Sequence, residues 1–492
     1  MPPFKVLISG GSLVGLTLAL ALERAGINFE VFEKGEIGPQ LGASIALHSQ
    51  SVRILEQLGV WKDIEPTVTQ LEKVRRLDAN DGRVFEESFQ LREISRVLRW
   101  PFFFIERRRL LQVLYKHIRD KSKVHDHTAV VSYEEHDDGV VVTTSDGRSF
   151  RGDVLVGADG IHSIVRAVMS ERISRINHAL STEIDQAFTT SYQALFGISR
   201  RDPSASDSFL PDGHTVYNVY GDNYSAIVTT SPPDLVFWFL FIKTGRTQDH
   251  KTPRYTDEDA QAVIDRYGRT ALGKNHTLRE LWDTRIRATL VPMEDGIVKQ
   301  WSHGRVLLLG DSAHKVTINA GLGGNLALEA VTQFTNGLVA LLKEKPSPSL
   351  SDLSSLFEQF DRVHRSRAEV ARTISAKTTQ TEAQETWFLR FHARYISPWF
   401  ISDQAKAGQY LRFAKDAPWL DFVPLPSRDA DLLDRREKER VGSRLSRIGR
   451  CLGAEHCWQQ RQLPQSGGDI GGDRGGLRRV ASSIAACNGQ SK

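Results

Sequence analysis

The fold of this chain is decided by the stretch Lys5-Val6-Leu7-Ile8-Ser9-Gly10-Gly11-Ser12-Leu13-Val14-Gly15-Leu16. An apolar run leads into a glycine cluster, and the helical pattern that follows ends at Gly26. A second short apolar run, residues 29–33, then ends in Glu33. This succession of strand, glycine turn, helix and strand predicts a parallel βαβ unit.

The glycines of this unit give a ligand access to the backbone. Gly10 lets the chain turn tightly out of the strand, and Gly15 lets the helix approach the sheet, so that the amides of the first helical turn face a pyrophosphate. Ser12 stands where the usual G-x-G-x-x-G pattern has its second glycine, and serine is small enough for the phosphate to come close. Glu33 ends the second strand, where a carboxylate accepts hydrogen bonds from a ribose. The unit predicts an adenine dinucleotide site, with a plain strand-to-helix turn as the alternative.

Composition and charge are those of an ordinary globular protein. The chain has 492 residues, 40% hydrophobic and 25% charged, enough for a large core and two joined domains. Its net charge of +4 is close to neutral for this length and gives no indication of a nucleic-acid partner. The longest apolar run, residues 235–242, is far shorter than the roughly 20 residues that cross a bilayer.

The ends of the chain add two expectations. Met1, Pro2 and Pro3 lead straight towards the first strand and leave no room for a signal peptide, so we expect a cytoplasmic protein or one that attaches peripherally to a membrane. The cysteines are Cys451, Cys457 and Cys487, which excludes a disulfide, a thiolate metal site or a cysteine nucleophile before residue 451. His456 beside two of these cysteines lacks a fourth ligand, so no metal site is predicted.

Three segments before residue 186 carry further signals. The glycine-punctuated loop 38–47 either lies against a flat ring system or is a plain connector. Arg107, Arg108 and Arg109 begin a helix; Arg107 is the one expected to reach inward to a phosphate or ribityl chain, with a solvated basic cluster as the alternative. The apolar strand 153–157 ends in a Gly-Ala-Asp-Gly turn that contains Asp159, at the strand end where ligands collect in an open α/β sheet.

The second half of the chain changes character twice. Residues 186–287 alternate aromatic and β-branched positions, which predicts an antiparallel sheet able to wall an apolar pocket. Residues 304–310 form a buried strand that returns to the first domain and is closed by Asp311, and a glycine run then opens a helix at 325–343. Two more helices are predicted at 352–383 and 387–413.

These patterns divide the chain into five parts. They are a first part of the nucleotide-binding domain with β-hairpin insertions, the antiparallel sheet, the return segment, C-terminal helices and a tail. The tail is rich in charged residues and glycine and is expected to be disordered. In order, the five parts are residues 1–185, 186–287, 288–345, 346–426 and 427–492.

The combination of the opening turn, the Asp159 turn and the Gly310-Asp311 pair resembles the para-hydroxybenzoate hydroxylase-like, group A FAD-dependent monooxygenases, over about residues 4–385. Within that superfamily several short segments look like the fungal epoxidase-type monooxygenases of meroterpenoid and indole-diterpene pathways. These segments are 10–12, 42–45, 106–107, 196–199, 237–239 and 311–315. The resemblance implies an α/β fold in which a Rossmann-like FAD-binding domain carries an inserted antiparallel substrate domain.

The resemblance also assigns residues to roles. It implies FAD contacts at Glu33, Ala46, Arg107, Asp311 and Gly324, a contact shared by FAD and NADPH at the Asp159 turn, and a catalytic tyrosine at Tyr217, which packing in the sheet explains equally well. This chain has Ala46 where the group commonly has glycine and Ile318 where it often has proline. It also lacks the C-terminal membrane helix often found in the group.

The function implied is oxygen transfer at a flavin. NADPH would reduce FAD, and one oxygen atom from O2 would pass to a hydrophobic, prenylated intermediate, with epoxidation of a farnesyl-type alkene preferred and a terpene cyclase acting downstream. Hydroxylation or Baeyer–Villiger oxidation of an aromatic polyketide is the second enzymatic reading. A scaffold protein that keeps FAD for structural reasons is the non-enzymatic one.

Overall fold

The opening stretch folds as a βαβ unit. In the computed structural model, β1 (Lys5–Ser9) lies parallel to β2 (Asn28–Phe32), and α1 (Leu13–Ala25) connects them. The structure describes residues 3–39, 44–201, 213–248, 254–429 and 431. The chain divides into a unit of residues 1–429 and a second unit from 430 onward, and all geometry below belongs to the first.

A six-stranded sheet grows from this unit in the order β17-β18-β11-β1-β2-β7. All its neighbours are parallel except β17 and β18. The strands added to β1 and β2 are β7 (Val124–His125), β11 (Val154–Gly157), β17 (Ser302–His303) and β18 (Val306–Leu308). The return segment therefore contributes strand β18 beside β11, as the sequence predicts.

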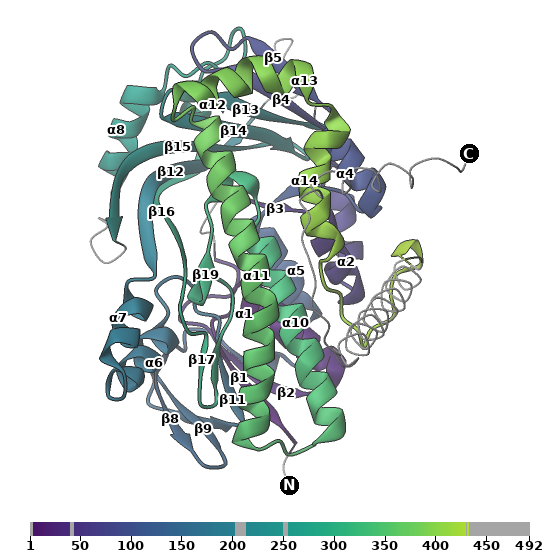
Figure 1. Cartoon of the computed structure of the whole chain (residues 1–492), viewed down its shortest axis with the longest axis vertical. Helices are drawn as coiled ribbons and strands as arrows, with labels where there is room; N and C mark the ends of the chain where they lie inside the picture. The colour runs from purple at the N-terminus through teal and green to yellow at the C-terminus, as the bar shows by residue number, and fades with distance from the viewer. Residues whose placement is uncertain (1–2, 40–43, 202–212, 249–253, 430, 432–492) are drawn as a thin grey trace, which may run out of the picture. The chain divides into compact units, whose positions relative to one another are not determined.

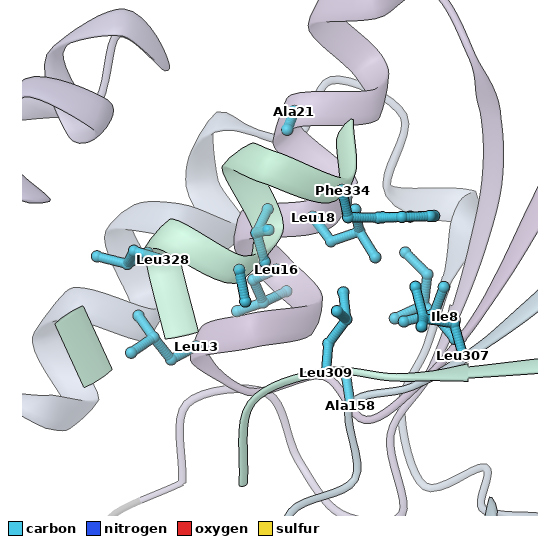
Figure 2. Packing of buried hydrophobic residues seen from close by; sticks show 14 of the residues in the cluster. Ile8, Leu13, Leu16, Leu18, Ala21, Ala158, Leu307, Leu309, Leu328 and Phe334 are labelled. Atoms are coloured by element: carbon cyan, nitrogen blue, oxygen red, sulfur yellow. The ribbon is translucent and has the colours of Figure 1, made fainter. Parts of the chain in front are cut away.

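Apolar side chains between this sheet and two helices form the largest core. Figure 2 shows Ile8 of β1 and Leu307 of β18 facing Leu16 of α1 and Phe334 of α10 (Gly323–Glu344). Each of these side chains is fully or almost fully buried. The core fixes α1 and α10 on the same side of the sheet, and both helices begin at the end where the strands stop.

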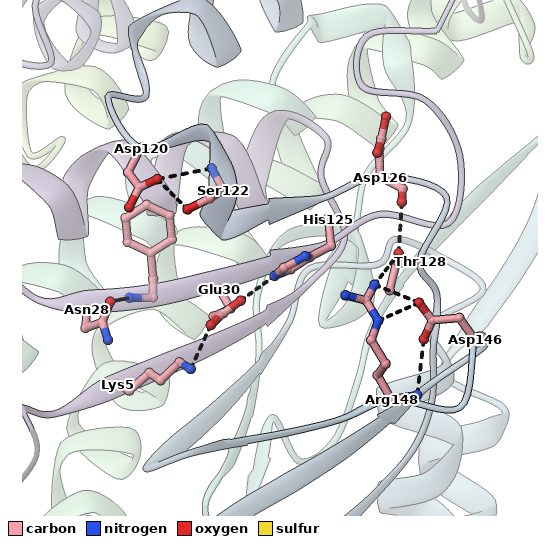
Figure 3. Close-up of polar contacts among 11 residues, drawn as sticks. Lys5, Asn28, Glu30, Asp120, Ser122, His125, Asp126, Thr128, Asp146 and Arg148 are labelled. Atoms are coloured by element: carbon pink, nitrogen blue, oxygen red, sulfur yellow. Dashed lines mark hydrogen bonds and ion pairs between the residues drawn. The ribbon is translucent and has the colours of Figure 1, made fainter.

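Polar side chains connect the edge strand β7 to β2 and β1. Lys5 Nζ lies 2.8 Å from the carboxylate of Glu30, which also accepts from the His125 ring (Figure 3). Beside it, Arg148 binds Asp146 at the turn of a small antiparallel sheet. That sheet is β10-β9-β8, formed by β8 (Val130–His136), β9 (Gly139–Thr144) and β10 (Ser149–Gly152).

The predicted antiparallel sheet is present and larger than expected. It has eight strands in the order β19-β16-β12-β15-β14-β13-β4-β5, antiparallel except for the parallel pair β13 and β4. Two of its strands, β4 and β5, come from the hairpin before residue 90, so the sheet is assembled from both sides of residues 186–287. Its strands are β4 (Lys73–Asp78), β5 (Val84–Ser88), β12 (Phe188–Arg200), β13 (Thr215–Tyr220), β14 (Tyr224–Ser231), β15 (Leu235–Gln248), β16 (Arg285–Ile297) and β19 (His314–Lys315).

Shorter elements connect the two large sheets. The pair β3 (Ser44–Leu47) and β6 (Phe103–Glu106) is antiparallel, and α5 (Arg107–His117) follows β6 directly. Further α-helices of the described residues surround the sheets. They are α2 (Ser49–Gln57), α3 (Trp61–Ile64), α4 (Gln90–Leu98), α6 (Ile164–Ser174), α7 (His178–Asp185), α8 (Asp257–Tyr267) and α9 (Leu278–Asp283).

The C-terminal helices depart from prediction in one place. Helix α11 (Leu350–Glu382) runs from β17 of the six-stranded sheet to β13 and β14 of the large one (Figure 1). The single helix predicted at 387–413 is wrong, because the segment breaks into α12 (Trp387–Phe391), a π-helical turn (His392–Ile396), α13 (Ser397–Phe400) and α14 (Asp403–Lys415). Ile401 is extended and the Ser402 hydroxyl caps α14, accepting from the amide of Ala405, which starts a new helix.

The first residues of the predicted tail are folded. Residues 427–429 form a 3₁₀ turn, and Asp429 accepts a hydrogen bond from the indole of Trp100 at 2.7 Å. Apart from residue 431, the rest of the tail, for which disorder is predicted, lies outside the described residues, as do the three cysteines.

Candidate functional site

The glycine turn after β1 leaves no space for side chains. Gly10 has φ +108°, and a Cβ there would lie 2.3 Å from the carbonyl oxygen of Ala158. A Cβ on Gly15 would lie 1.8 Å from the carbonyl oxygen of Gly10. Both distances are far below van der Waals contact, so β1, α1 and the strand end at β11 can approach this closely only with glycine at both positions.

The first turn of α1 is open to a ligand. Ser12 is the N-cap residue, yet its side chain makes no cap hydrogen bond; its Oγ instead accepts from the Arg107 guanidinium at 2.6 Å. The first hydrogen bond inside the helix runs from the Leu16 amide to the Ser12 carbonyl, and the residues before it line a cavity. Amides of this kind form an anion site at a helix N-terminus.

Glu33 stands across the turn from these amides. Its carboxylate accepts from the amide of Gly11 at 2.7 Å and from that of Gly35 at 3.1 Å. Both oxygens are fixed by backbone, and each keeps a second lone pair for a hydroxyl group in the cavity. This is the geometry by which an acid at a strand end binds a ribose.

Arg107 and Asp311 both line this cavity. Arg107 is the first residue of α5, and the strand pair β3 and β6 sets its position. Burial lowers the pKa of its guanidinium, and the carboxylates of Asp311 and Glu33 oppose that shift. Lys315 Nζ lies 3.7 Å from Asp311, whose side chain is 44% exposed. A cation and an anion are thus available for a phosphate and a polyol chain.

Asp159 caps the next helix and touches the cavity. Its Oδ2 accepts from the amides of Ile164 at 2.9 Å and Val165 at 3.2 Å. Burial raises the pKa of this carboxyl, and hydrogen bonds that include the Ser163 hydroxyl act in the opposite direction.

Ala46 and Gly324 meet on the far side of the turn. Asn325, near the start of α10, donates to the carbonyl of Ala46 at 2.9 Å. A Cβ on Gly324 would lie 2.5 Å from Cδ1 of Ile45. The small residues let strand β3 lie against the N-terminus of α10, and both line the cavity. All eight residues predicted for cofactor binding are therefore brought to one place, with Gly15 directly behind the lining residues.

The cavity continues from this cradle to the large sheet. Its volume is about 1750 Å³, beyond the ~300–1,000 Å³ of a typical single-ligand pocket. Away from the glycine turn its wall is mainly apolar and aromatic. The side chains there include Phe104, Phe196, Val216, Ile227, Phe239 and Met293.

Comparisons with known proteins agree with this geometry. A family model described as FAD binding domain matches residues 3–356. The chain is 33% identical over 432 residues to the FAD-dependent monooxygenase cdmI of Talaromyces verruculosus, covering 86% of this chain and 88% of that protein. It is 34% identical over 434 residues to the FAD-dependent monooxygenase dpasE of Apiospora sacchari, covering 86% of this chain and 88% of that protein. The chain belongs to the FAD-dependent monooxygenases.

A solved structure shows the same fold. HpxO of Klebsiella pneumoniae, complexed with FAD and uric acid, superposes with a TM-score of 0.67 at 18% identity, covering 84% of this chain and 97% of that one. The predicted fold class and family are confirmed. The chain is an oxidoreductase, so the scaffold reading is set aside.

The residues present fit FAD. The glycine turn and the α1 amides would take the pyrophosphate, Glu33 the adenosine ribose, and Asp311 with Arg107 the ribityl phosphate region. When bound, the flavin supplies the redox and oxygen-transfer chemistry. The protein's part is to hold it beside the apolar end of the cavity and to keep water away.

Tyr217, the predicted catalytic residue, does not reach the cavity. Side chains alternate along β13, so Val216, Asn218 and Tyr220 line the cavity while Tyr217 packs into the core on the other face of the sheet. Its environment is that of a packing residue, in contact with Arg75 of the neighbouring strand. The catalytic role has no support from its position.

A polar group that the sequence patterns did not predict lies at the apolar end of the cavity. Glu382, the last residue of α11, is 3% exposed and lines the cavity. Its carboxylate accepts from the side-chain amides of Asn218 at 2.7 Å and Asn319 at 2.6 Å. Burial raises the pKa of Glu382 to about 7, against the effects of Asn319, Arg76 and Asn218. The cavity thus holds a carboxyl that exchanges a proton near neutral pH.

A signal for Glu382 was present in the helix pattern. The buried residues of α11 follow a three- and four-residue spacing that runs through Ala371, Ser375 and Thr379 and ends at Glu382. An acidic residue on the buried face of an amphipathic helix indicates a candidate functional residue, because burying an unpaired charge is unfavourable.

The described residues contain neither a metal site nor a membrane-spanning helix. Within the described ranges, no group of three or more His, Cys, Asp or Glu side chains is arranged to hold a metal ion. Among the helices of those ranges, none combines the length and apolar character needed to cross a membrane.

Proposed function

We propose that this chain is an NADPH-dependent epoxidase that acts on the terminal alkene of a prenyl, farnesyl-type chain in a hydrophobic secondary-metabolite intermediate. The alkene, O2, NADPH and a proton give the epoxide, water and NADP⁺, so that one oxygen atom enters the product and the other leaves as water. A terpene cyclase that opens the epoxide would act next.

The observation that carries this proposal is the continuity of the cavity. One space of about 1750 Å³ joins the FAD cradle to a wall of phenylalanine and aliphatic side chains. A long apolar chain gains free energy along such a wall in proportion to the area it buries, at ~25 cal/mol per Å². The polar groups near Glu382 suit the hydroxyl-bearing head of the same molecule.

Product analysis tests the reaction. The holoenzyme is incubated with a farnesylated phenol, NADPH and isotope-labelled O2, and the product is fragmented by mass spectrometry. Labelled oxygen on the terminal alkene with the ring intact supports the proposal. Labelled oxygen on the ring, or inserted beside a ring carbonyl, would assign hydroxylation or Baeyer–Villiger oxidation instead. The cosubstrate is tested by anaerobic bleaching of the flavin, which should be faster with NADPH than with NADH.

A pair of variants tests the cavity wall. Val216→Phe narrows the apolar end, and it is expected to lower kcat/KM for a farnesylated substrate at least tenfold while NADPH still reduces the flavin. Val131→Phe makes the same change on β8, where the side chain is 48% exposed, and should leave kcat/KM unchanged. Equal effects of the two variants would argue against a long substrate along this wall.

A further inference from the structure

The described residues carry all their exposed large aromatic side chains on one short segment, residues 387–400. We call it the aromatic segment. It comprises α12, the π-helical turn and α13, which lie over the β4 and β5 end of the large sheet (Figure 1). Its exposed members are Trp387 (79%), Phe388 (58%), Phe391 (48%), Tyr395 (58%), Trp399 (79%) and Phe400 (78%).

The backbone of the aromatic segment is anchored to the large sheet and the strand turn beside it. Arg390 pairs with Asp222 at 2.7 Å, Arg394 pairs with Asp78, and Ala393 is buried. The exposed rings are therefore displayed by an anchored backbone. The other large hydrophobic side chains exposed in the described residues are aliphatic, and most stand alone in the sequence, as is normal for a protein surface. A cluster of aromatic rings marks an interaction surface instead.

The chemistry of the segment indicates its partner. Tryptophan and tyrosine concentrate where a bilayer meets water, because their rings combine an apolar body with a polar tip, and phenylalanine inserts below them. Residues 386–401 contain Arg390, Arg394 and His392 but no aspartate or glutamate, so the segment itself presents no negative charge to anionic headgroups. Amphipathic helices with aromatic residues on the apolar face lie in the plane of the interface.

The same segment forms part of the cavity wall. Leu389, His392, Ala393 and Ser397 line the cavity, as does Ile401 just beyond α13. One side of this segment therefore faces the apolar space and the other carries the exposed rings. Phe388 belongs to both, because it is 58% exposed and also lines the cavity. The exposed surface and the cavity wall therefore meet within this segment, at Phe388.

We propose that the aromatic segment docks the enzyme on a lipid bilayer without spanning it, and that the apolar substrate passes from the bilayer into the cavity along this segment. The docking step is inferred from the exposed residues of the aromatic segment alone. The transfer step rests on the proposed function, because it requires an apolar substrate.

Docking is tested with the full-length holoenzyme and vesicles of phosphatidylcholine, alone and mixed with phosphatidylserine. The wild-type protein should sediment with vesicles, and its tryptophan emission should shift to the blue. The double variant Trp399→Ser with Phe400→Ser should bind at least about tenfold more weakly, because both rings are lost from the interface. Ile176→Ser removes a side chain that is 81% exposed between α6 and α7, and should bind like the wild type.

Three results would overturn the docking proposal. They are no sedimentation of the wild type with either vesicle, equal binding of the double variant and the wild type, and a dimer in solution that the double variant abolishes. The last would assign the surface to a second copy of the chain. None of these measurements needs a substrate, so their failure is distinct from failure of the proposed reaction.

The transfer step has its own readout. With a prenylated substrate dissolved in vesicles, the double variant should lose most of its turnover, and with the same substrate in detergent micelles it should retain the wild-type rate. NADPH-driven flavin reduction should be unchanged in both settings. Equal losses in vesicles and micelles would show that the aromatic rings act on the cavity and not on delivery from lipid.

Discussion

The two ends of the cavity recognise their ligands by different means. The FAD end uses backbone: glycines that admit no Cβ, the amides of α1, and Glu33 fixed by two amides. The substrate end uses side chains brought together from distant parts of the chain: Asn218 of β13, Asn319, and Glu382 of α11. Backbone recognition needs a local fold, and side-chain recognition needs the whole tertiary structure.

The ends differ in their electrostatics as well. At the FAD end, Arg107 stands near the carboxylates of Asp311 and Glu33, so the charges are partly balanced. At the substrate end, the pKa of Glu382 is raised to about 7, mainly by burial. The FAD end therefore presents neighbouring positive and negative side chains to a charged cofactor, and the substrate end presents a buried carboxyl whose pKa is raised to about 7.

The largest effect is expected where backbone recognition leaves no freedom. Gly15→Ala places a methyl group 1.8 Å from the Gly10 carbonyl, so α1 has to move away from the pyrophosphate position. We expect FAD affinity to fall more than about 100-fold, measured by flavin absorbance of the purified protein and by titration of the apoprotein.

The control is another helical glycine. Gly408→Ala in α14 adds a methyl group that meets no atom within 4 Å, and it should leave FAD bound. A Gly15→Ala protein that retains its full complement of flavin would show that the close approach of β1 and α1 is not what binds the cofactor.

A smaller effect is expected from the substrate end, and it depends on pH. The pKa of Glu382 is raised from 4.5 to about 7, so the folded state binds this proton more tightly than the unfolded state. The raised pKa therefore lowers the free energy of unfolding as pH rises from below 4.5 to about 7. Above pH 7 this contribution to the free energy of unfolding is constant. Glu382→Gln removes it, so the stability of the variant relative to wild type should rise by about 3 kcal/mol over this range.

Denaturant unfolding at several pH values measures this difference. The altered hydrogen bonds to Asn218 and Asn319 also lower the stability of the variant, but this loss does not depend on pH. It therefore does not affect how the difference in unfolding free energy changes with pH. Glu369→Gln removes an exposed carboxyl from the same helix and should not produce this slope. A flat difference for Glu382→Gln would mean that its carboxylate is already stabilised in the folded protein.

The contrast between the two ends also explains what the sequence could predict. The βαβ unit, the Asp159 turn and the Asp311 strand end were identified because each is a contiguous pattern whose geometry follows from glycines and apolar runs. The strands within residues 186–287 were predicted for the same reason, but β16 (Arg285–Ile297) and β19 (His314–Lys315) were not. The pairing of β4 with β13 was not predicted, because residues 73–78 and 215–220 are far apart in the sequence and no local pattern indicates that they pair.

Two differences from the sequence-based predictions concern the face of β13 on which Tyr217 lies and the continuity of the helix predicted at 387–413. Strand β13 is buried on both faces, so its sequence shows no alternation that tells Tyr217 from its neighbours. The break near Ile401 interrupts a segment that is helical in pattern on both sides, and the two parts cover different regions: α13 contacts β5 and α14 contacts α4. Tertiary packing determines both the face on which a strand residue lies and the point where a helix breaks, and local propensity does not predict either.

The smallest effect is expected on the far face of the large sheet. Tyr217→Phe removes a hydroxyl group that does not reach the cavity, so kcat/KM should change by less than about twofold, with a loss of stability of about 1 kcal/mol. Tyr220→Phe removes the hydroxyl that accepts from Arg76 at 3.2 Å on the cavity face, and KM for the substrate should rise several-fold. Steady-state product formation measures both variants under the same conditions. A tenfold or greater fall in kcat for Tyr217→Phe, with Tyr220→Phe unaffected, would place the reacting atoms on the opposite side of the sheet from the FAD cradle, and the comparison of the two ends would then fail.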